Sequence, residues 1–469
     1  MASTLAARKI SANIDMCEGP LFKKIVLFAV PLFLTSILNL LFNAADLIVV
    51  GRFGSSVSVA AVGATTSLIH LIVNLFMGVS SGVGVTVATE IGAQNNLSVK
   101  RTVHTAIPLS VVFGGIINVV MFLFAEPLLL LMDTPDDVIG LSTVYLKIYS
   151  CGMVPTMVYN FAAAILRAEG DTAKPLMFLS LSGVINVILN VIFVVAFNMD
   201  VAGVALATAL SQTVSAVLVI IELMRRKDCC RLRLRRMRFH HGQLGKVLAV
   251  GIPAGIQSIT FSLSNVIIQS SINSFGSIAM AGSAAAASIG SFVFVGCDTF
   301  QQTAMNFAGQ NYGAGKIDRV RRTLALCLIS VTVTELVLGL ASVLFATPLH
   351  ALYITDSDLA IEYGIRRTVF VCVPYFIAGI MNVFSGTIRA LGHSVSPMAI
   401  SIFSNCVFRV FWIFTVFAGF RSSDFAWEIL FSSYPISWTL AVIVQIAVYT
   451  NIIRKVKNRY KLLDITKTK

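Results

Sequence analysis

Apolar stretches long enough to cross a lipid bilayer recur along the whole chain, and they constrain the fold more than any other feature. A membrane-spanning helix needs about 20 mostly apolar residues. Twelve stretches meet this condition, near residues 25–49, 59–88, 102–125, 141–165, 175–198, 202–223, 247–273, 279–307, 323–346, 365–387, 397–419 and 427–453. Transmembrane β-strands are about ten residues long and alternate in polarity. The sequence therefore predicts an all-α polytopic membrane protein with twelve transmembrane helices.

The basic residues are distributed in a way that orients these helices. The chain has 35 Lys and Arg against 22 Asp and Glu, a net charge of +13. If the N-terminus is cytoplasmic, 29 of the 35 basic residues lie in the tails and inner loops. This is the positive-inside pattern, so we expect both termini in the cytoplasm and no nucleic-acid partner. The basic run from Arg225 to His241 could also contact anionic membrane lipids, although a topogenic linker is the simpler interpretation.

This basic run separates two halves that resemble each other. At an offset of 222 residues, Pro31 matches Pro253 and Pro175 matches Pro397. Further matches at this offset are Asn43 with Asn265, Asn160 with Asn382, the loop 53–55 with 275–277, and the segment 166–170 with 388–392. We expect an N-lobe of helices 1–6 (1–224), a basic linker (225–245) and a C-lobe of helices 7–12 (246–469). Six crossings return the chain to the same side, so the lobes are predicted to be parallel repeats, as in transporters that work by alternating access.

The first apolar stretch, 31–54, carries a carboxylate in its second half. Asp46 follows Asn43, Asn39 and Thr35 at spacings that place all four on one helical face. An ionisable group at membrane depth is costly and normally faces a water-filled cavity or a partner. Asp46 is therefore a candidate functional residue. The alternative is a structural Asp that bonds to a neighbouring backbone.

Two other N-lobe stretches carry polar stripes. The fifth holds Ser182, Asn186 and Asn190, and the sixth holds Thr208, Ser211, Gln212 and Ser215. Small hydroxyl residues often join transmembrane helices, and this is the reading we favour for the three serines. Buried amides are costlier to leave unpaired, so for the amides a structural and a functional role are equally open.

Together these features resemble those of the multidrug and toxic compound extrusion (MATE) transporters, particularly their bacterial branch. The resemblance covers about residues 20–465. It rests on Pro31…Asn43-x-x-Asp46…Val50-Gly51-Arg52-Phe53-Gly54, on Gly309-Gln310-Asn311-Tyr312-Gly313-Ala314 and on Ile165-Leu166-Arg167-Ala168-Glu169-Gly170-Asp171. It implies a two-lobed exporter of organic, often cationic, compounds in the bacterial inner (plasma) membrane, driven by H⁺ or Na⁺.

The resemblance also implies a cation site in the N-lobe. The predicted set for the cation or the substrate is Asp46, Asn43, Asn186, Asn190, Thr208 and Gln212. Where many relatives carry a second aspartate, this chain has Asn190, and Phe42 replaces a Tyr of some relatives. One carboxylate fewer weakens the field for Na⁺, whereas a lone buried Asp can still bind one proton, since burial penalises its charged form. We therefore expect H⁺ coupling. The alternative is Na⁺ bound at Asp46, Asn186, Asn190 and Thr208.

The C-lobe lacks an acid that corresponds to Asp46, because Ile268 occupies the matching position. Its eighth apolar stretch holds Asp298 and Gln302, and its eleventh holds Arg409. We predict a C-lobe polar site from these three residues. Asp298 and Arg409 are natural partners within one lobe, and we favour a structural pair over a contact with substrate.

No motif in the sequence indicates catalysis. A phosphate-binding G-x-x-x-x-G-K-[ST] loop is absent, and the eight cysteines show no metal-ligand spacing. We predict a monomeric transporter of small organic compounds that is not an enzyme and needs neither cofactor nor bound metal. A lipid-linked oligosaccharide flippase of related fold is the nearest alternative, although it should carry several basic groups for a pyrophosphate head. A membrane enzyme or a channel is a more distant one.

Overall fold

The structure, a computed structural model, describes residues 14–53, 55–132, 134–355 and 357–467. All regular secondary structure in these residues is helical, as expected. The chain forms two compact units. The first comprises residues up to Thr66 and Thr86–Leu244, and the second comprises Ser67–Val85 and the residues from Gly245 onward.

The helices that begin before the boundary at Leu244 are α2 (Leu21–Phe53), α3 (Ser56–Gly92), α4 (Asn96–Leu123), α5 (Ala125–Leu130), α6 (Asp136–Cys151), α7 (Met153–Glu169), α8 (Ala173–Val191), the π-helical turn η2 (Ile192–Ala196), α9 (Asp200–Arg225), the 3₁₀ turn η3 (Leu234–Arg236) and α10 (His241–Asn273). Within the first unit α8 packs against α9 and α2, and α4 packs against α7.

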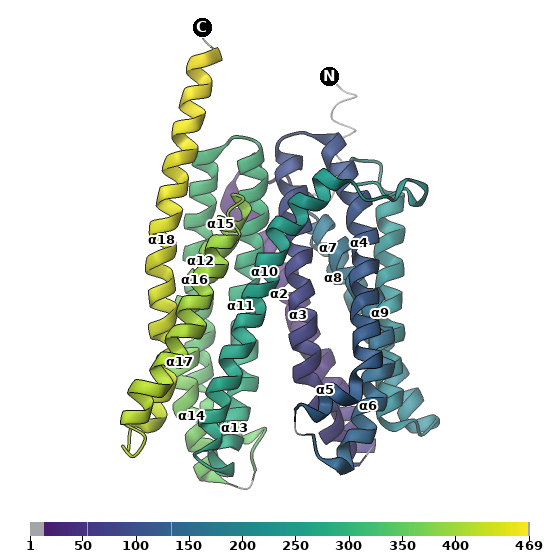
Figure 1. The fold of residues 1–469 in the computed structure, drawn as a ribbon, viewed down its shortest axis with the longest axis vertical. Helices are drawn as coiled ribbons and strands as arrows, with labels where there is room; N and C mark the ends of the chain where they lie inside the picture. The colour runs from purple at the N-terminus through teal and green to yellow at the C-terminus, as the bar shows by residue number, and fades with distance from the viewer. Residues whose placement is uncertain (1–13, 54, 133, 356, 468–469) are drawn as a thin grey trace. The chain divides into compact units, whose positions relative to one another are not determined.

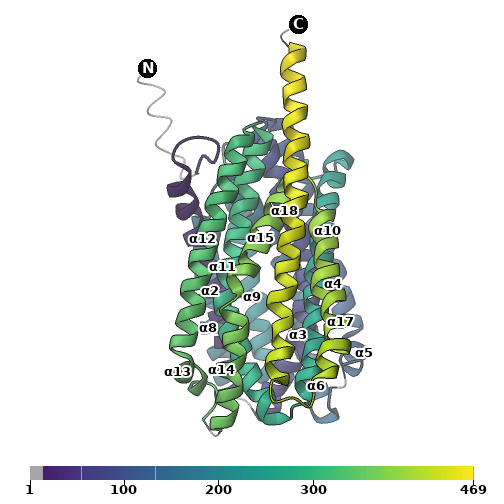
Figure 2. The same ribbon diagram turned by 90° about the vertical axis from the view of Figure 1, so that its left-hand side faces the viewer.

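The remaining elements all belong to the second unit. They are α11 (Ser277–Gly313), α12 (Ile317–Leu344), α13 (Ala346–Ala351), α14 (Asp358–Cys372), α15 (Tyr375–Ala390), α16 (Val395–Ser401), η4 (Ile402–Val407), α17 (Phe408–Trp412), η5 (Ile413–Phe417) and α18 (Ala426–Lys467). α11 packs against α12, α14 and α15, which run alongside it in Figure 1. α18 passes beside α15 (Figure 2).

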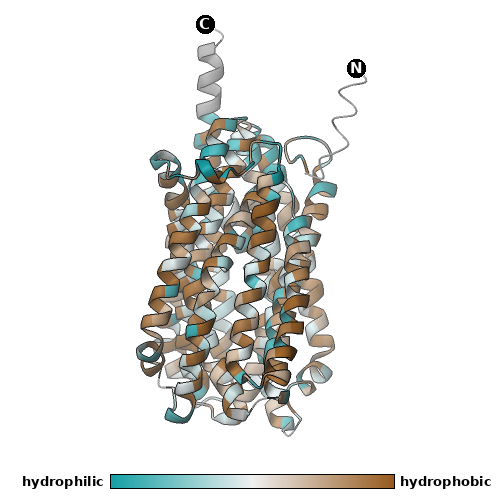
Figure 3. Ribbon diagram, turned by 90° about the vertical axis from the view of Figure 1, so that its right-hand side faces the viewer, coloured by the Kyte–Doolittle hydropathy of each residue, from teal (hydrophilic) through white to brown (hydrophobic). Residues whose placement is uncertain are grey.

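Among the described residues, eleven helices are long and apolar enough to cross a membrane, and α6 with α7 forms a twelfth span bent by 46°. The bend lies at Gly152, where an added Cβ would lie 2.9 Å from the Cα of Ala209. Glycine therefore permits α9 to approach the bend closely. In Figure 3 hydrophobic residues dominate the middle of the helices in view. The predicted all-α fold with twelve spans is confirmed.

The middle of α3 packs differently from the expected contiguous lobes, because Ser67–Val85 belongs to the second unit. An added Cβ on Gly78 would lie 2.1 Å from the backbone nitrogen of Gly255 in α10, and one on Gly82 would lie 2.3 Å from the backbone oxygen of Val247. Glycines on both helices thus let two backbones approach closely, as small residues do between transmembrane helices. The expected boundaries at 224 and 246 remain a prediction.

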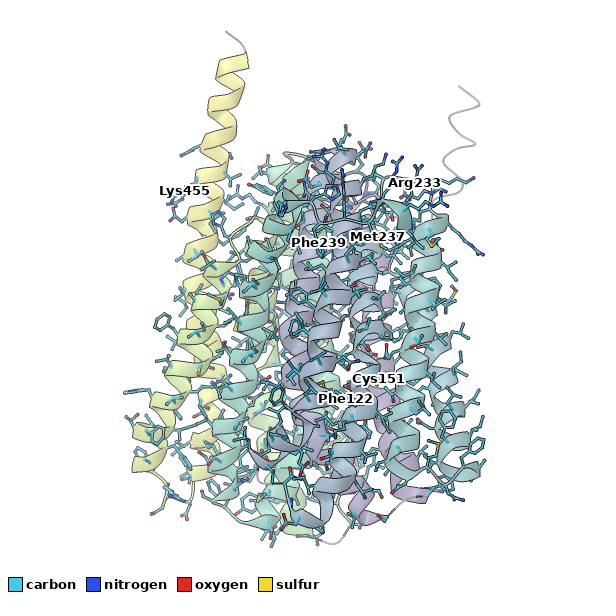
Figure 4. All side chains as sticks on the ribbon, turned by 45° about the vertical axis from the view of Figure 1, so that its right-hand side comes forward. Phe122, Cys151, Arg233, Met237, Phe239 and Lys455 are labelled. Atoms are coloured by element: carbon cyan, nitrogen blue, oxygen red, sulfur yellow. The ribbon has the colours of Figure 1, made fainter. Side chains whose placement is uncertain are left out.

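The segment after α9 is folded onto the first unit. The backbone nitrogen of Arg233 donates to Nε2 of His104 in α4 at 3.1 Å, and Thr102 of α4 donates to Gln243 at 3.1 Å. Figure 4 shows Arg233, Met237 and Phe239 at one end of the helices, with Phe122 and Cys151 farther along them. The predicted basic linker is therefore an ordered part of this unit.

Candidate functional site

The predicted N-lobe site begins with Asp46 on α2. α2 packs against α8 at Gly183, where an added Cβ would lie 1.8 Å from Cζ of Phe42. The aromatic ring fills the space that a side chain on α8 would occupy. Asp46 lies one helical turn after Phe42, and Asn186 and Asn190 lie one and two turns after Gly183. This close approach therefore brings the acid and the two amides to the same level of the first unit.

Three predicted residues surround the carboxylate of Asp46. Nδ2 of Asn190 donates to Oδ1 of Asp46 at 2.5 Å, and Oγ1 of Thr208 on α9 donates to Oδ2 at 3.3 Å. Asn186 extends this network, because its Nδ2 donates to Thr208 at 3.3 Å and its Oδ1 accepts from Asn190 at 3.2 Å. Both amides are buried, whereas Asp46 is half-buried. The structure thus brings together four of the six predicted residues.

The other two predicted residues remain outside this network. Asn43 is exposed, Gln212 is half-buried, and neither makes a hydrogen bond within the part of the chain that the structure describes. Thr35 bonds only locally, to the carbonyl of Pro31 at 2.7 Å. The helical face predicted for α2 therefore contributes Asp46 alone to the site.

The chemistry of the site follows from its donors and acceptors. Amide and hydroxyl donors that point at a carboxylate suit its ionised form. Oδ1 of Asn190, which is buried, accepts no hydrogen bond from the described residues. A carboxylate and neighbouring amide and hydroxyl oxygens can receive a proton or ligate a small cation. The π-helical turn η2 follows Asn190 directly, and such turns are frequent at functional sites.

Two of the three serines, Ser182 and Ser215, join helices as expected, whereas Ser211 bonds within α9. Oγ of Ser215 on α9 donates to Oγ of Ser182 on α8 at 2.6 Å, and Ser211 donates to the carbonyl of Thr208 at 2.9 Å. The first of these bonds holds α8 against α9, and the second lies within α9. They therefore support the positions of the amides and of Thr208 without contacting Asp46.

The C-lobe polar set is only partly assembled. Nε2 of Gln302 donates to Oδ2 of Asp298 at 2.8 Å. Arg409 does not pair with Asp298: its guanidinium donates to Ser437 at 3.0 Å and to Ser264 at 3.2 Å, and it lies over the ring of Tyr434. The expected Asp298–Arg409 pair is thus wrong. The reason is that Arg409 faces α10 and α18, whereas Asp298 lies on α11.

Two buried charged residues of the second unit were given no role from the sequence. Arg389 is 6% exposed and donates from Nη2 to Oε1 of Gln257 at 2.8 Å. Glu335 on α12 is fully buried, and its side chain lies beside Cys297 of α11. Glu335 packs against Gly296 of α11, where an added Cβ would lie 2.3 Å from its Oε1. Arg389 and Glu335 lie on different apolar stretches, and their positions in the sequence do not predict a shared site.

An ionic cluster lies where α9 ends and the linker begins. Arg226 pairs with Glu169, with Asp171 at 2.6 Å and with Glu222 at 3.3 Å, and it lies 3.6 Å from Asp228. Burial alone would lower the pKa of Arg226, but the carboxylates of Glu169, Asp171 and Asp228 together raise it above its ordinary value. The charge of Arg226 is therefore firmly retained in this cluster.

Ligand atoms of Glu169, Asp228 and Cys230 lie within 4.8 Å of one another in the same cluster. Arg226 pairs with two of these three groups and so already balances much of their charge. Cys230 also donates a hydrogen bond to Cys229, which lowers the pKa of the Cys229 thiol to about 7. The geometry favours an ion-pair cluster over a metal centre.

Comparison with known proteins places the chain among membrane transporters. A family model described as MatE matches it twice, at residues 31–192 and 253–415, and the two matches begin 222 residues apart. This offset equals that of the predicted internal repeat. The twofold match confirms that the chain is built from two homologous halves.

Individual relatives are more distant. The probable multidrug resistance protein YoeA of Bacillus subtilis is 27% identical over 391 residues, which cover 82% of this chain and 84% of that protein. A FAD transporter of Shewanella oneidensis is 25% identical over 369 residues, with coverage of 77% and 80%. A solved structure of a multidrug resistance MATE transporter in an outward-facing conformation has a TM-score of 0.88 at 21% identity and covers 96% of this chain and 100% of that one. The likeness to the solved structure concerns the fold.

Proposed function

The chain belongs to the MatE family of transporters, and from this membership we propose that it exports organic cations in exchange for an inward-moving H⁺. Several relatives are named as multidrug resistance or export proteins. We propose that it works as a monomer in a bacterial plasma membrane with both termini in the cytoplasm.

The observation that carries this proposal is the set of hydrogen bonds to Asp46 from Asn190 and Thr208. A lone carboxylate among neutral amides changes its net charge by a full unit when it takes up one proton. Amides and hydroxyls keep their charge, so the switch resides in Asp46. The second carboxylate that would favour Na⁺ is replaced by Asn190. Na⁺ coupling is therefore the alternative that the experiment below must exclude.

In the proposed cycle Asp46 is ionised when it attracts a cationic compound. A proton from the outer side then neutralises it, the compound is released outward, and deprotonation toward the cytoplasm restores the charge. Coupling requires that the proton bind the two conformations with different affinity. The hydrogen bonds from Asn190 and Thr208 supply such a difference if the rocking of the lobes lengthens them, because they stabilise the ionised carboxylate.

The test is export of ethidium from proteoliposomes under an imposed proton or sodium gradient. We expect the proton gradient to drive export, and we expect Asp46→Asn to reduce driven export at least a hundredfold. Asn is close in shape to a protonated Asp but cannot release a proton, so this variant should insert and fold normally.

Asp200→Asn provides the matched control, because Asp200 is an acid at the start of α9 that accepts from Ser58 at 2.5 Å, outside the Asp46 site. We expect it to retain driven export. Unchanged export by Asp46→Asn at equal protein levels would remove Asp46 from the mechanism. Export driven only by the sodium gradient would assign the coupling to Na⁺.

A further inference from the structure

We propose that the cluster around Arg409 in the second unit is a binding subsite for the carboxylate of an aromatic exported compound. This inference rests on the proposed export function and adds a class of substrate to it. Arg409 is only 2% exposed and lies on α17, between α10 and α18. Its surroundings contain hydroxyl groups and aromatic rings.

The donors of Arg409 are incompletely used. A guanidinium carries five N–H donors and stays charged in proteins. Nε donates to Ser437 and Nη1 donates to Ser264, whereas Nη2 is buried and has no hydrogen-bond partner among the described residues. Serine hydroxyls supply acceptors but no negative charge. A buried cation is costly unless an anion accompanies it. The cluster therefore has a free donor, and within the described part of the chain no carboxylate pairs with Arg409.

Aromatic rings lie next to the guanidinium group of Arg409. The guanidinium carbon of Arg409 lies 4.1 Å from the ring centre of Tyr434 and 5.9 Å from that of Trp438. The Trp438 ring packs edge to face on Tyr434 at 5.6 Å and also contacts Tyr375 at 5.5 Å. Planar guanidinium groups stack on aromatic faces and bind carboxylates through their edge. A flat aromatic compound with a carboxylate satisfies both preferences at once.

Hydrogen-bonded polar side chains connect the Arg409 cluster to the exposed face of α10. The hydroxyl of Tyr434 donates to Oδ1 of Asn265 at 3.1 Å, and Asn265 is exposed. One turn further Gln269, also exposed, donates to Asn273 at 3.0 Å. A compound that reaches this face of α10 is therefore separated from Arg409 by the Tyr434 side chain.

The other buried arginine of the unit shows why Arg409 is the better candidate. Arg389 also leaves a donor unused, its Nε. However, its Nη2 bonds to Gln257, whose Nε2 in turn donates to Ser401 at 3.0 Å. All of these partners are buried. Arg389 therefore belongs to an internal chain of bonds without an exposed polar neighbour.

The experiment uses two dyes that differ in one group. Rhodamine 110 has a free carboxylate, and rhodamine 123 is its methyl ester with the same aromatic rings. Binding of each dye to the purified full-length protein is followed by fluorescence anisotropy. We expect Arg409→Met to weaken the binding of rhodamine 110 at least tenfold and that of rhodamine 123 less than twofold. Arg409→Lys, which keeps the charge but loses the planar fork, should recover part of the loss.

Arg389→Met is the matched control, since it also removes a buried arginine of this unit, and it should change the two affinities by the same factor. A measurement on the unaltered protein removes any dependence on folding of the variants: benzoate should displace rhodamine 110, whereas neutral benzamide should not. The inference is overturned if benzoate is no better than benzamide, if the wild type does not bind rhodamine 110, or if Arg409→Met weakens both dyes equally.

These outcomes are distinct from failure of the proposed function. Export of rhodamine 123 by the wild type in proteoliposomes, and its loss in Asp46→Asn, test that function alone. Absent export with an intact difference between the two dyes would contradict the proposed coupling and leave the carboxylate subsite supported.

Discussion

The sites around Asp46 and Arg409 lie on corresponding spans of the two repeats and have opposite charge. In the first unit an acid on α2 receives hydrogen bonds from α8 and α9. In the second unit a base on α17 donates to α10 and α18, the counterparts of α2 and α9. The comparison teaches that the repeat preserved helix packing while the charge at the centre of each half changed independently.

The loops between the fourth and fifth spans of the two repeats also differ in charge. The segments 166–170 and 388–392 correspond, and each contains a glycine in the left-handed region, Gly170 with φ 105° and Gly392 with φ 85°. Only the first segment has an acid, Glu169, at a position where the second has Leu391. The first unit consequently holds Arg226 in an ionic cluster, whereas Arg389 of the second bonds to an amide.

We expect the largest effect on stability, where substitutions of Arg226 and Arg389 should lower the unfolding temperature by different amounts. Removing one partner of a buried ion pair costs about 3–5 kcal/mol, and Arg226→Met removes the guanidinium that pairs with Glu169 and Asp171. Arg389→Met removes a bond to a neutral amide, for which about 1–2 kcal/mol is a reasonable loss. In detergent, the apparent unfolding temperature should therefore fall at least twice as far for Arg226→Met. Lys227→Met, at an exposed linker position, is the control. If the apparent unfolding temperature fell equally in the two arginine variants, the expected difference between an ion-paired and an amide-bonded arginine would be contradicted.

A second acid should act differently in the two units. Asn190→Asp places two carboxylates side by side at Asp46, and these cannot both remain ionised without a cation. We expect sodium-driven export to rise at least tenfold relative to proton-driven export, which corresponds to about 1.4 kcal/mol.

Asn405→Asp is the corresponding change in the second unit, because Asn405 is buried one turn before Arg409. There the new acid should neutralise Arg409 instead of recruiting Na⁺. A sodium response in both variants would show that any added acid suffices, so that the charge difference between the units has no bearing on ion choice.

The smallest effect concerns the cysteines. Cys229 of the linker is half-buried with a thiol pKa of about 7, while Cys297 and Cys327 of the second unit are buried. The thiolate is the reactive form, so the rate of alkylation at Cys229 should rise with pH through about 7 and reach half its plateau there. Peptide mass spectrometry resolves each cysteine.

Cys230→Ala removes the donor to Cys229 and should move this midpoint upward toward that of an ordinary thiol, about 8.5. Cys297 and Cys327 should stay unmodified throughout. An unchanged midpoint in Cys230→Ala would mean that the hydrogen bond does not lower the Cys229 pKa.

The sequence by itself determined the spans and the internal repeat. Apolar length decides which segments can cross a membrane, and this property is local. The four-residue spacing of Asn186 and Asn190 also places them on one face of any helix. Such regularities need no knowledge of neighbouring elements. The grouping of Asp46, Asn190 and Thr208 follows instead from the resemblance to MATE transporters, and the structure brings these three side chains within hydrogen-bond distance.

Only the tertiary structure decided which polar residues meet across helices. At the offset of 222, Asn186 corresponds to Phe408, yet Arg409 is the residue that faces α10 and α18. The π-helical turn η4, just before it, holds more residues per turn than an α-helix and shifts the inward face along the chain. Asp298 and Arg409 do not pair, and Asn43 lies outside the Asp46 network, for the same reason. Spacing along the sequence defines a face of one helix, but the rotation of that helix against its neighbours depends on contacts such as Phe42 on Gly183, which only the packed structure contains.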